Sequence, residues 1–259
     1  MLFCHGMFAH QVLANLLYPP ACLLCHASLS SVEPVGAAQH PRQAQLLCEE
    51  CLLALPRAEP PLCLRCGVPL DAPYDAAIRC ARCRLSPPAF DAARATWRYA
   101  GATQEAIRRF KFHHRWRLGR WLAEEMAATA RQTLPLEAID LVAPVPLHWL
   151  KRTLKGFAPA EDLACAVAQR LRKPYVRGAL RPVRWTASQS RLQARQRFRN
   201  VRGAFAARPR LVNGRGVLLI DDVLTSGATA QACAQALKSA GARSVVVLAA
   251  ARTPHPGDP

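Results

Sequence analysis

The 259-residue chain has no apolar run of the ~20 residues that a membrane-spanning helix needs, so no membrane insertion is expected. Residues 1–20 lack both a basic leader and a small-residue cleavage site, which argues against a signal peptide and predicts a cytoplasmic protein. They are expected to form one amphipathic helix that stops at Pro19 and Pro20. Because cytoplasmic proteins rarely form disulfides, the eleven cysteines are not expected to pair with one another.

Acidic residues are scarce: 17 Asp and Glu face 35 Lys and Arg, and the net charge is +18. Residues 1–91 hold 6 basic and 7 acidic residues, whereas residues 92–259 hold 29 and 10. Between Asp162 and Asp221 there are 14 basic residues and no acidic one. Such a field attracts polyanions, namely nucleic acid, phosphorylated metabolites or an acidic partner. The alternative is a general preference for Arg on solvated faces.

Eight of the cysteines form four C-x-x-C pairs between residues 22 and 83. Each pair aims two thiolates at one point, and two pairs complete a tetrahedral Cys₄ zinc site. The segment therefore predicts two structural Zn²⁺ ions, which replace a hydrophobic core. Sequential pairing would give a double zinc ribbon and interleaved pairing a cross-brace, and the spacing leaves both open. The predicted ligands are Cys22, Cys25, Cys48, Cys51, Cys63, Cys66, Cys80 and Cys83.

After a proline-bearing linker at 84–91, strand-like and helix-like patterns alternate. Helical spacing occurs at 102–112, 115–132, 158–173 and 227–241, and strand patterns occur at 94–101, 139–147, 201–205, 216–220 and 244–251. This alternation predicts an α/β domain over residues 92–259, with a mostly parallel sheet and helices on both faces. A smaller zinc-ribbon domain is expected over residues 21–86. Ligands of such sheets bind at the carboxyl ends of the strands.

The stretch VLLIDDVLTSGATA, residues 217–230, ends a buried strand on two aspartates. Adjacent carboxylates repel each other unless cations or hydroxyls face them. The following loop offers hydroxyls, backbone N–H groups and a helix N-terminus, a combination suited to a phosphate. Together they predict a sugar-phosphate site, in which Asp221 and Asp222 contact ribose hydroxyls and Mg²⁺. The phosphate would be held by Thr225, Ser226, Gly227, Ala228 and Thr229.

The segment LLIDDVLTSGAT resembles the ribose-5-phosphate loop of type I phosphoribosyltransferases. The whole chain is similar to the ComF family, also called GntX-like, which joins a double zinc ribbon to a phosphoribosyltransferase-like domain. Besides the C-x-x-C pairs, the resemblance rests on FKF at 110–112, APVPLHWLKRTLKGF at 143–157 and RWTASQSRLQARQRFRNVRGAF at 184–205. It implies a phosphoribosyltransferase-like fold that binds phosphoribosyl pyrophosphate with Mg²⁺.

The resemblance also implies where the pyrophosphate would lie. Its binding loop would be Val145, Pro146 and Leu147, and a hood closing over it would use Arg195 and Arg197. The chain departs from the family pattern R-G-F-N-Q at KGFAP, where Lys155 replaces Arg and Ala158 and Pro159 replace Asn and Gln. This departure is expected to affect turnover more than ligand binding, because the phosphate loop is intact.

Two functions fit these observations. The first is a phosphoribosyltransferase that acts on phosphoribosyl pyrophosphate or a nucleotide, with an acceptor base that the sequence does not identify. The second is a non-catalytic zinc-ribbon scaffold or nucleotide sensor that binds single-stranded DNA or DNA-uptake proteins. The link to DNA uptake and natural competence is inherited from the family resemblance.

Overall fold

In the computed structural model, the described residues are 20–29, 46–70, 78–112, 116–147, 158–184 and 194–254. The expected helix over residues 1–20 lies outside them, apart from its last residue. The chain divides into two compact units, Met1–Leu55 and Pro56–Pro259. The first unit contains the short helix α2 (Glu49–Leu53) and the first two C-x-x-C pairs. The other two pairs belong to the second unit, together with the α/β domain.

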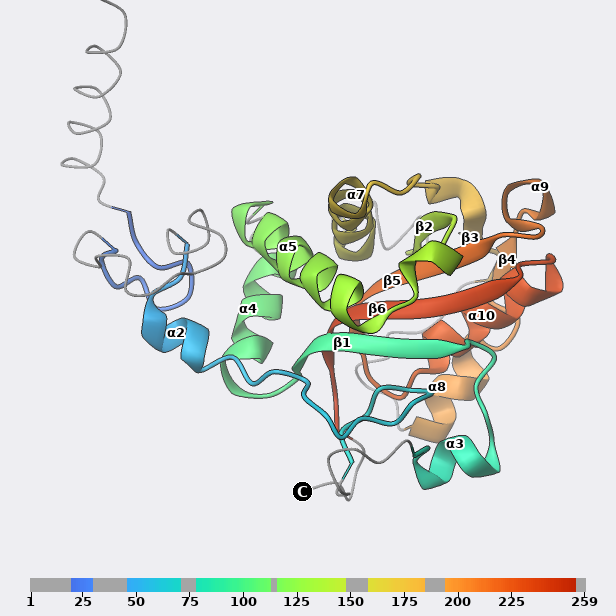
Figure 1. Cartoon of the computed structure of the whole chain (residues 1–259), viewed down its shortest axis with the longest axis horizontal. Helices are drawn as coiled ribbons and strands as arrows, with labels where there is room; N and C mark the ends of the chain where they lie inside the picture. The colour runs from blue at the N-terminus through green and yellow to red at the C-terminus, as the bar shows by residue number, and fades with distance from the viewer. Residues whose placement is uncertain are drawn as a thin grey trace, which may run out of the picture. The chain divides into compact units, whose positions relative to one another are not determined.

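The second unit is built around a four-stranded parallel sheet in the order β1-β6-β5-β2 (Figure 1). The strands are β1 (Ala92–Arg98), β2 (Leu141–Pro144), β5 (Gly216–Leu224) and β6 (Ser244–Arg252). The central strands β5 and β6 are almost continuous apolar runs, as strands buried on both faces require. The prediction of a mostly parallel sheet is confirmed. Strand β5 runs on to Leu224, so both aspartates lie inside it, whereas the sequence pattern ended the strand at residue 220.

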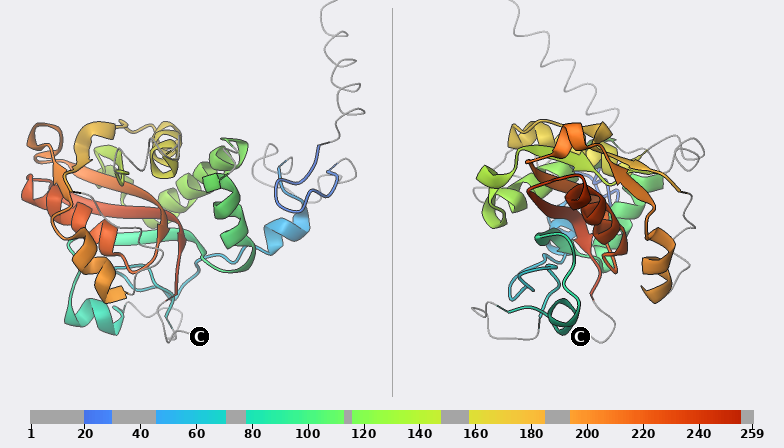
Figure 2. Two further views of the ribbon diagram at one scale, coloured as in Figure 1. Left: turned by 180° about the vertical axis from the view of Figure 1, so that it is seen from behind. Right: turned by 90° about the vertical axis from the view of Figure 1, so that its right-hand side faces the viewer.

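Helices cover both faces of this sheet, as predicted (Figures 1 and 2). One face carries α5 (Trp116–Thr133) and α7 (Pro159–Leu171), and the other carries α10 (Ala228–Ser239). Helix α5 turns a stripe that includes Leu118, Leu122 and Met126 into the core, at the spacing that an amphipathic helix requires. Helix α4 (Gly101–Phe112) precedes α5, and the short helices η1 (Leu136–Ala138) and α9 (Pro209–Val212) precede β2 and β5.

The segment between α7 and β5 differs from its prediction. The sequence pattern predicts a single strand at 201–205, but Val201 is the last residue of helix α8 (Ala194–Val201) and a strand begins only at Phe205. The strand that follows, β4 (Phe205–Ala207), pairs antiparallel with β3 (Leu180–Pro182), which follows the short helix η2 (Arg177–Ala179). Phe198, Val201 and Phe205 pack against Ala228 and Ala232 of α10. Helix formation here therefore depends on a long-range apolar contact, because the helix itself is mostly polar.

Residues 56–70 cover the free edge of β1. Ala58 N donates to Thr96 O at 3.1 Å, Arg98 N donates to Pro56 O at 2.8 Å, and Ala93 N donates to Arg65 O at 2.8 Å. Gly67 lies against this strand with φ +66°, and a Cβ atom placed there would be 2.3 Å from Ala93 O. Covering an edge in this way removes a template for unwanted strand pairing. The second cysteine cluster is thus fixed to the sheet by backbone hydrogen bonds.

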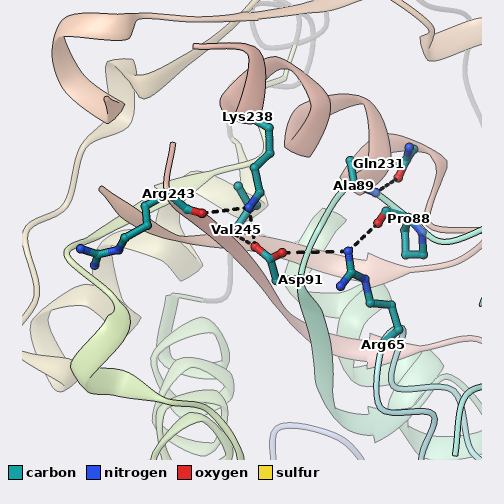
Figure 3. Close-up of polar contacts among 8 residues, drawn as sticks. All are labelled: Arg65, Pro88, Ala89, Asp91, Gln231, Lys238, Arg243 and Val245. Atoms are coloured by element: carbon teal, nitrogen blue, oxygen red, sulfur yellow. Dashed lines mark hydrogen bonds and ion pairs between the residues drawn. The ribbon is translucent and has the colours of Figure 1, made fainter. Parts of the chain in front are cut away.

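The linker after helix α3 (Ala81–Leu85) is held by side-chain contacts (Figure 3). The Asp91 carboxylate accepts a hydrogen bond from Val245 N at 2.7 Å and pairs with Lys238 Nζ at 2.8 Å. Ala89 N donates to Gln231 Oε1 at 2.6 Å, and Arg65 Nη2 donates to Pro88 O at 2.9 Å. The linker therefore joins the cysteine-bearing segment to β6 and α10 at several points.

Candidate functional site

Two groups of four cysteines bring their sulfur atoms together, one in each unit. Within each group all Sγ atoms lie within 4.8 Å of one another. Tetrahedral zinc with Zn–S bonds of about 2.3 Å places its sulfur ligands about 3.8 Å apart, so both groups fit the ion. The pairing is sequential: Cys22, Cys25, Cys48 and Cys51 form the first group, and Cys63, Cys66, Cys80 and Cys83 form the second. The prediction of two Cys₄ zinc sites is confirmed, and the interleaved alternative is wrong.

The first pair of each group forms the same tight turn. Cys22 N donates to Ala27 O and Cys63 N donates to Val68 O, both at 2.8 Å. The residue after the second cysteine takes a left-handed conformation in both turns: His26 has φ +64° and Gly67 has φ +66°. Backbone N–H groups also point at sulfur, as in the 3.4 Å contact from Leu24 N to Cys22 Sγ. Such donors stabilise thiolates, so these turns are preorganised for metal.

A cavity of about 460 Å³ opens at the carboxyl ends of β2 and β5 in the second unit. Strand β5 contributes Asp221 and Asp222, and the segment after β2 contributes Val145, Pro146 and Leu147. This is where an open parallel sheet binds its ligand. The other described residues that line it are Tyr99, Lys111, Ala158, Pro159, Ala160, Pro182, Arg184, Arg197, Phe205, Val223, Thr225 and Thr229.

The aspartates have one cationic neighbour that the sequence did not identify as a site residue. Lys111, near the end of α4, places Nζ 2.9 Å from Asp222 Oδ2, and the side chains are 27% and 18% exposed. Asp221 instead accepts the backbone N–H of Asp222 through Oδ1 at 2.9 Å. The two carboxylates thus have different partners, as their alternation along a strand predicts. Lys111 lies in FKF, so the family motif was the available signal.

Burial and the neighbouring Asp222 carboxylate raise the pKa of Asp221 to about 8. Burial opposes the charge on Lys111, but the carboxylates of Asp222 and Asp221 outweigh it and raise the pKa of this ammonium group. At neutral pH the site therefore holds a proton on Asp221 and an ion pair beside it. A divalent cation would displace that proton, because it favours the charged form of both acids.

The loop between β5 and α10 is divided between two sides. Thr225 and Thr229 line the aspartate cavity, while Ser226, Gly227 and Ala228 line a second cavity behind the loop. Gly227 precedes the helix with φ +76°, a conformation that favours glycine, and Ala228 N donates to Ser226 Oγ at 3.4 Å. The loop therefore offers its backbone at a helix N-terminus, although its five residues do not all face one cavity.

Most of the other site residues expected from the sequence can be placed. Arg197 lies in α8 and lines the aspartate cavity, whereas the side chain of Arg195 is outside the described part of the structure. Ala158 and Pro159, the departures from the family pattern, also line this cavity. Two apolar residues thus occupy a wall where the family pattern has Asn and Gln. Lys155 lies outside the described residues.

Comparison with known proteins identifies the family. A model described as the double zinc ribbon domain matches residues 13–84. DNA utilization protein YhgH of Escherichia coli (strain K12) is 30% identical over 210 residues, which cover 80% of this chain and 90% of that protein. Competence protein F of Haemophilus influenzae is 28% identical over 197 residues, with 74% and 85% of the chains covered.

Solved structures with a similar chain fold include phosphoribosyl pyrophosphate enzymes. The glutamine phosphoribosylpyrophosphate amidotransferase from B. subtilis, solved with ADP and GMP, is 24% identical; the match covers 51% of this chain and 26% of that chain, with a TM-score of 0.35. TT1426 from Thermus thermophilus is 22% identical, with 51% and 72% covered and a TM-score of 0.32. These scores add no weight of their own, so the family assignment rests on the sequence relatives.

The parallel sheet with its aspartate cavity and the two Cys₄ sites define an α/β protein that carries zinc ribbons. The chain belongs to the ComF family, together with DNA utilization protein YhgH and Competence protein F. No helix in the described part of the chain has the length and apolar character needed to cross a membrane.

Proposed function

We propose that the aspartate cavity binds phosphoribosyl pyrophosphate together with Mg²⁺. The observation that carries the proposal is the meeting of Asp221 and Asp222 with Thr225 and Thr229 of the following loop in one cavity at the edge of the sheet. Carboxylates suit ribose hydroxyls and a hard divalent cation, and a loop at a helix N-terminus suits the 5′-phosphate. A single ribose 5-phosphate would use both sets of groups, with its hydroxyls toward the aspartates and its phosphate toward the loop.

The other walls fit the pyrophosphate end of the same ligand. Backbone groups of Val145, Pro146 and Leu147 follow β2, and the side chains of Arg184 and Arg197 reach the cavity from other segments of the chain. Arg184 is positioned by two hydrogen bonds of 2.9 Å, from Nη2 to Asn200 O and Arg202 O. Fixed cations of this kind stabilise the negative charge on a departing pyrophosphate. Mg²⁺, when bound, would neutralise part of the same charge.

Ligand binding and phosphoribosyl transfer are separate steps of this proposal. The groups for binding are present, but Ala158 and Pro159 bring no hydrogen-bonding side chain to the wall that they form. We therefore infer that ligand binding is the primary function of the cavity and that transfer to an acceptor base is an additional step. A cytoplasmic location stays a prediction.

A thermal-stability screen tests binding. Phosphoribosyl pyrophosphate with Mg²⁺ at about 100 times its dissociation constant should add about 2.7 kcal/mol to the free energy of unfolding. The same ligand with EDTA in place of Mg²⁺ should add much less. Glu137→Gln, an exposed carboxylate outside the cavity, is the matched control for Asp222→Asn. Equal stabilisation of wild type, Asp222→Asn and Glu137→Gln would contradict the proposal.

A second candidate function is binding of single-stranded DNA, favoured by the charge of +18 and by relatives named for DNA utilization and competence. Basic residues that neutralise phosphates make affinity fall steeply with salt. A gel shift with single-stranded DNA over a salt series should therefore show retardation that disappears as salt rises. No retardation at the lowest salt would exclude direct DNA binding, and the family link to DNA uptake would then require a protein partner.

A further inference from the structure

The second unit contains another cavity, of about 800 Å³, on the far side of the β5–α10 loop. Its walls come from the zinc-bearing segment, helix α8, the start of α10 and the end of β6. It shares no lining residue with the aspartate cavity. The views in Figures 1 and 2 show α8 beside α10. Helix α8 thus contributes to both cavities: Arg197 lines the first, and Phe198, Val201 and the adjoining Arg202 line the second.

The charge of this cavity is positive. Arg82, Arg202 and Arg252 line it, and none of the described lining residues is acidic. Arg252 is only 2% exposed, and neither its Nε nor its Nη1 has a hydrogen-bond partner among the described residues. A buried guanidinium with two unpaired nitrogen donors is unfavourable unless something else supplies acceptors or negative charge. The Cys66 and Cys83 sulfurs line the same cavity and balance part of this charge, but Arg82 and Arg202 add two further cations.

The cavity also offers recognition of a planar group. Arg82 lies over the ring of Phe198 with its Cζ atom 4.8 Å from the ring centroid. The carboxamides of Gln231 and Gln235 line the neighbouring wall. Aromatic rings and guanidinium planes stack on nucleobases, carboxamides bond their edges, and arginines bind phosphate in a bidentate manner. The volume is within the range of small-molecule sites.

We propose that this second cavity binds a nucleoside phosphate, with its phosphate held by Arg82, Arg202 and Arg252 and its base against Phe198. The ligand would contact Ser226 and Gly227, on the opposite side of the loop from the aspartates. It would thus bind between the zinc-bearing segment and the loop. Because the second zinc site is attached to the sheet by hydrogen bonds, it would hold one wall of this cavity in place for the ligand. The proposal does not depend on phosphoribosyl pyrophosphate binding in the first cavity.

Calorimetric titration of the full-length zinc-loaded protein with each of the four ribonucleoside 5′-monophosphates tests this site. At least one should bind, and Arg202→Glu and Arg82→Glu should each weaken it about tenfold or more, the loss of one charge-assisted contact. Both side chains are exposed, so these variants are expected to fold. Arg84→Glu, an exposed residue of the same helix that does not line the cavity, is the matched control and should change little.

Four further measurements decide the location of the site and the kind of ligand. Arg252→Met, checked for zinc content and thermal stability, should also weaken binding, while Asp222→Asn should leave it unchanged. Binding that Asp222→Asn abolishes and Arg202→Glu spares belongs to the aspartate cavity, which overturns the proposal. Binding of inorganic phosphate as tight as that of the nucleotide overturns the role of the base. The proposal is also overturned if a short single-stranded oligonucleotide binds and no mononucleotide binds at millimolar concentration.

Discussion

Replacing Lys111 by Met tests the electrostatics of the aspartate cavity. The Lys111 ammonium lies 2.9 Å from Asp222, and the side chains are 27% and 18% exposed. Exposed ion pairs contribute about 0.2–1 kcal/mol, and breaking a fully buried pair costs about 3–5 kcal/mol. This pair lies between these limits, so Lys111→Met should lower the free energy of unfolding by about 1–3 kcal/mol. The loss should be larger than for an exposed pair because it leaves the partly buried Asp222 carboxylate without its cation, next to Asp221.

A double-mutant cycle measured by urea denaturation isolates this interaction. Lys111→Met and Asp222→Asn should show a coupling energy of about 1 kcal/mol or more, because the second change removes the charge that the first leaves unpaired. The Glu105–Arg108 pair, at 2.8 Å on the surface of α4, is the matched control and should couple by about 0.5 kcal/mol or less. A coupling no larger than that of the control would refute the electrostatic account of the site.

Three further predictions concern pH and zinc. Folding raises the pKa of Asp221 to about 8 through burial and the Asp222 carboxylate, so the folded state binds an extra proton between about pH 4 and pH 8. The free energy of unfolding of the ligand-free protein should therefore fall as pH rises through this window. In Asp221→Asn this fall should be absent when unfolding is followed at several pH values. An equal fall in both proteins would contradict the raised pKa of Asp221. Cys22→Ser should make residues 20–29 and 46–55 sensitive to protease and leave the thermal transition of the second unit in place, because one metal site holds these described residues of the first unit together. Cys63→Ser should instead lower the thermal transition of the second unit, since Cys63 packs in the same core as Ala93 and Val247; an unchanged transition would show that this zinc site is not structural.

Features encoded by neighbouring residues could be predicted from the sequence. Continuous apolar runs such as that of β6 and the helical spacing of α5 and α7 predicted the parallel sheet and its cover, because burial depends on local pattern. The C-x-x-C pairs predicted the zinc sites, because two thiolates in one turn already form half of a site. The aspartates and the phosphate loop were recognisable because they adjoin in the chain.

Features that depend on distant contacts could not be predicted. Lys111 meets Asp222 only because α4 reaches the carboxyl end of β5; the FKF motif marks Lys111 as a family feature but does not encode this contact. Helix α8 is mostly polar and forms against Ala228 and Ala232, so its sequence resembles a basic loop. The second cavity brings together four separate segments of the chain. The attachment of the Cys63–Cys83 group to β1 depends on backbone hydrogen bonds, which leave almost no mark on residue type.

Calorimetric titration with phosphoribosyl pyrophosphate tests the central claim most directly. In the presence of Mg²⁺ the wild-type protein should bind one molecule per chain, and EDTA should remove the binding. Asp221→Asn and Asp222→Asn should each weaken it by about 100-fold, which corresponds to about 2.7 kcal/mol. Unchanged affinity in both variants, or binding that is indifferent to Mg²⁺, would contradict the assignment of this cavity to a sugar pyrophosphate.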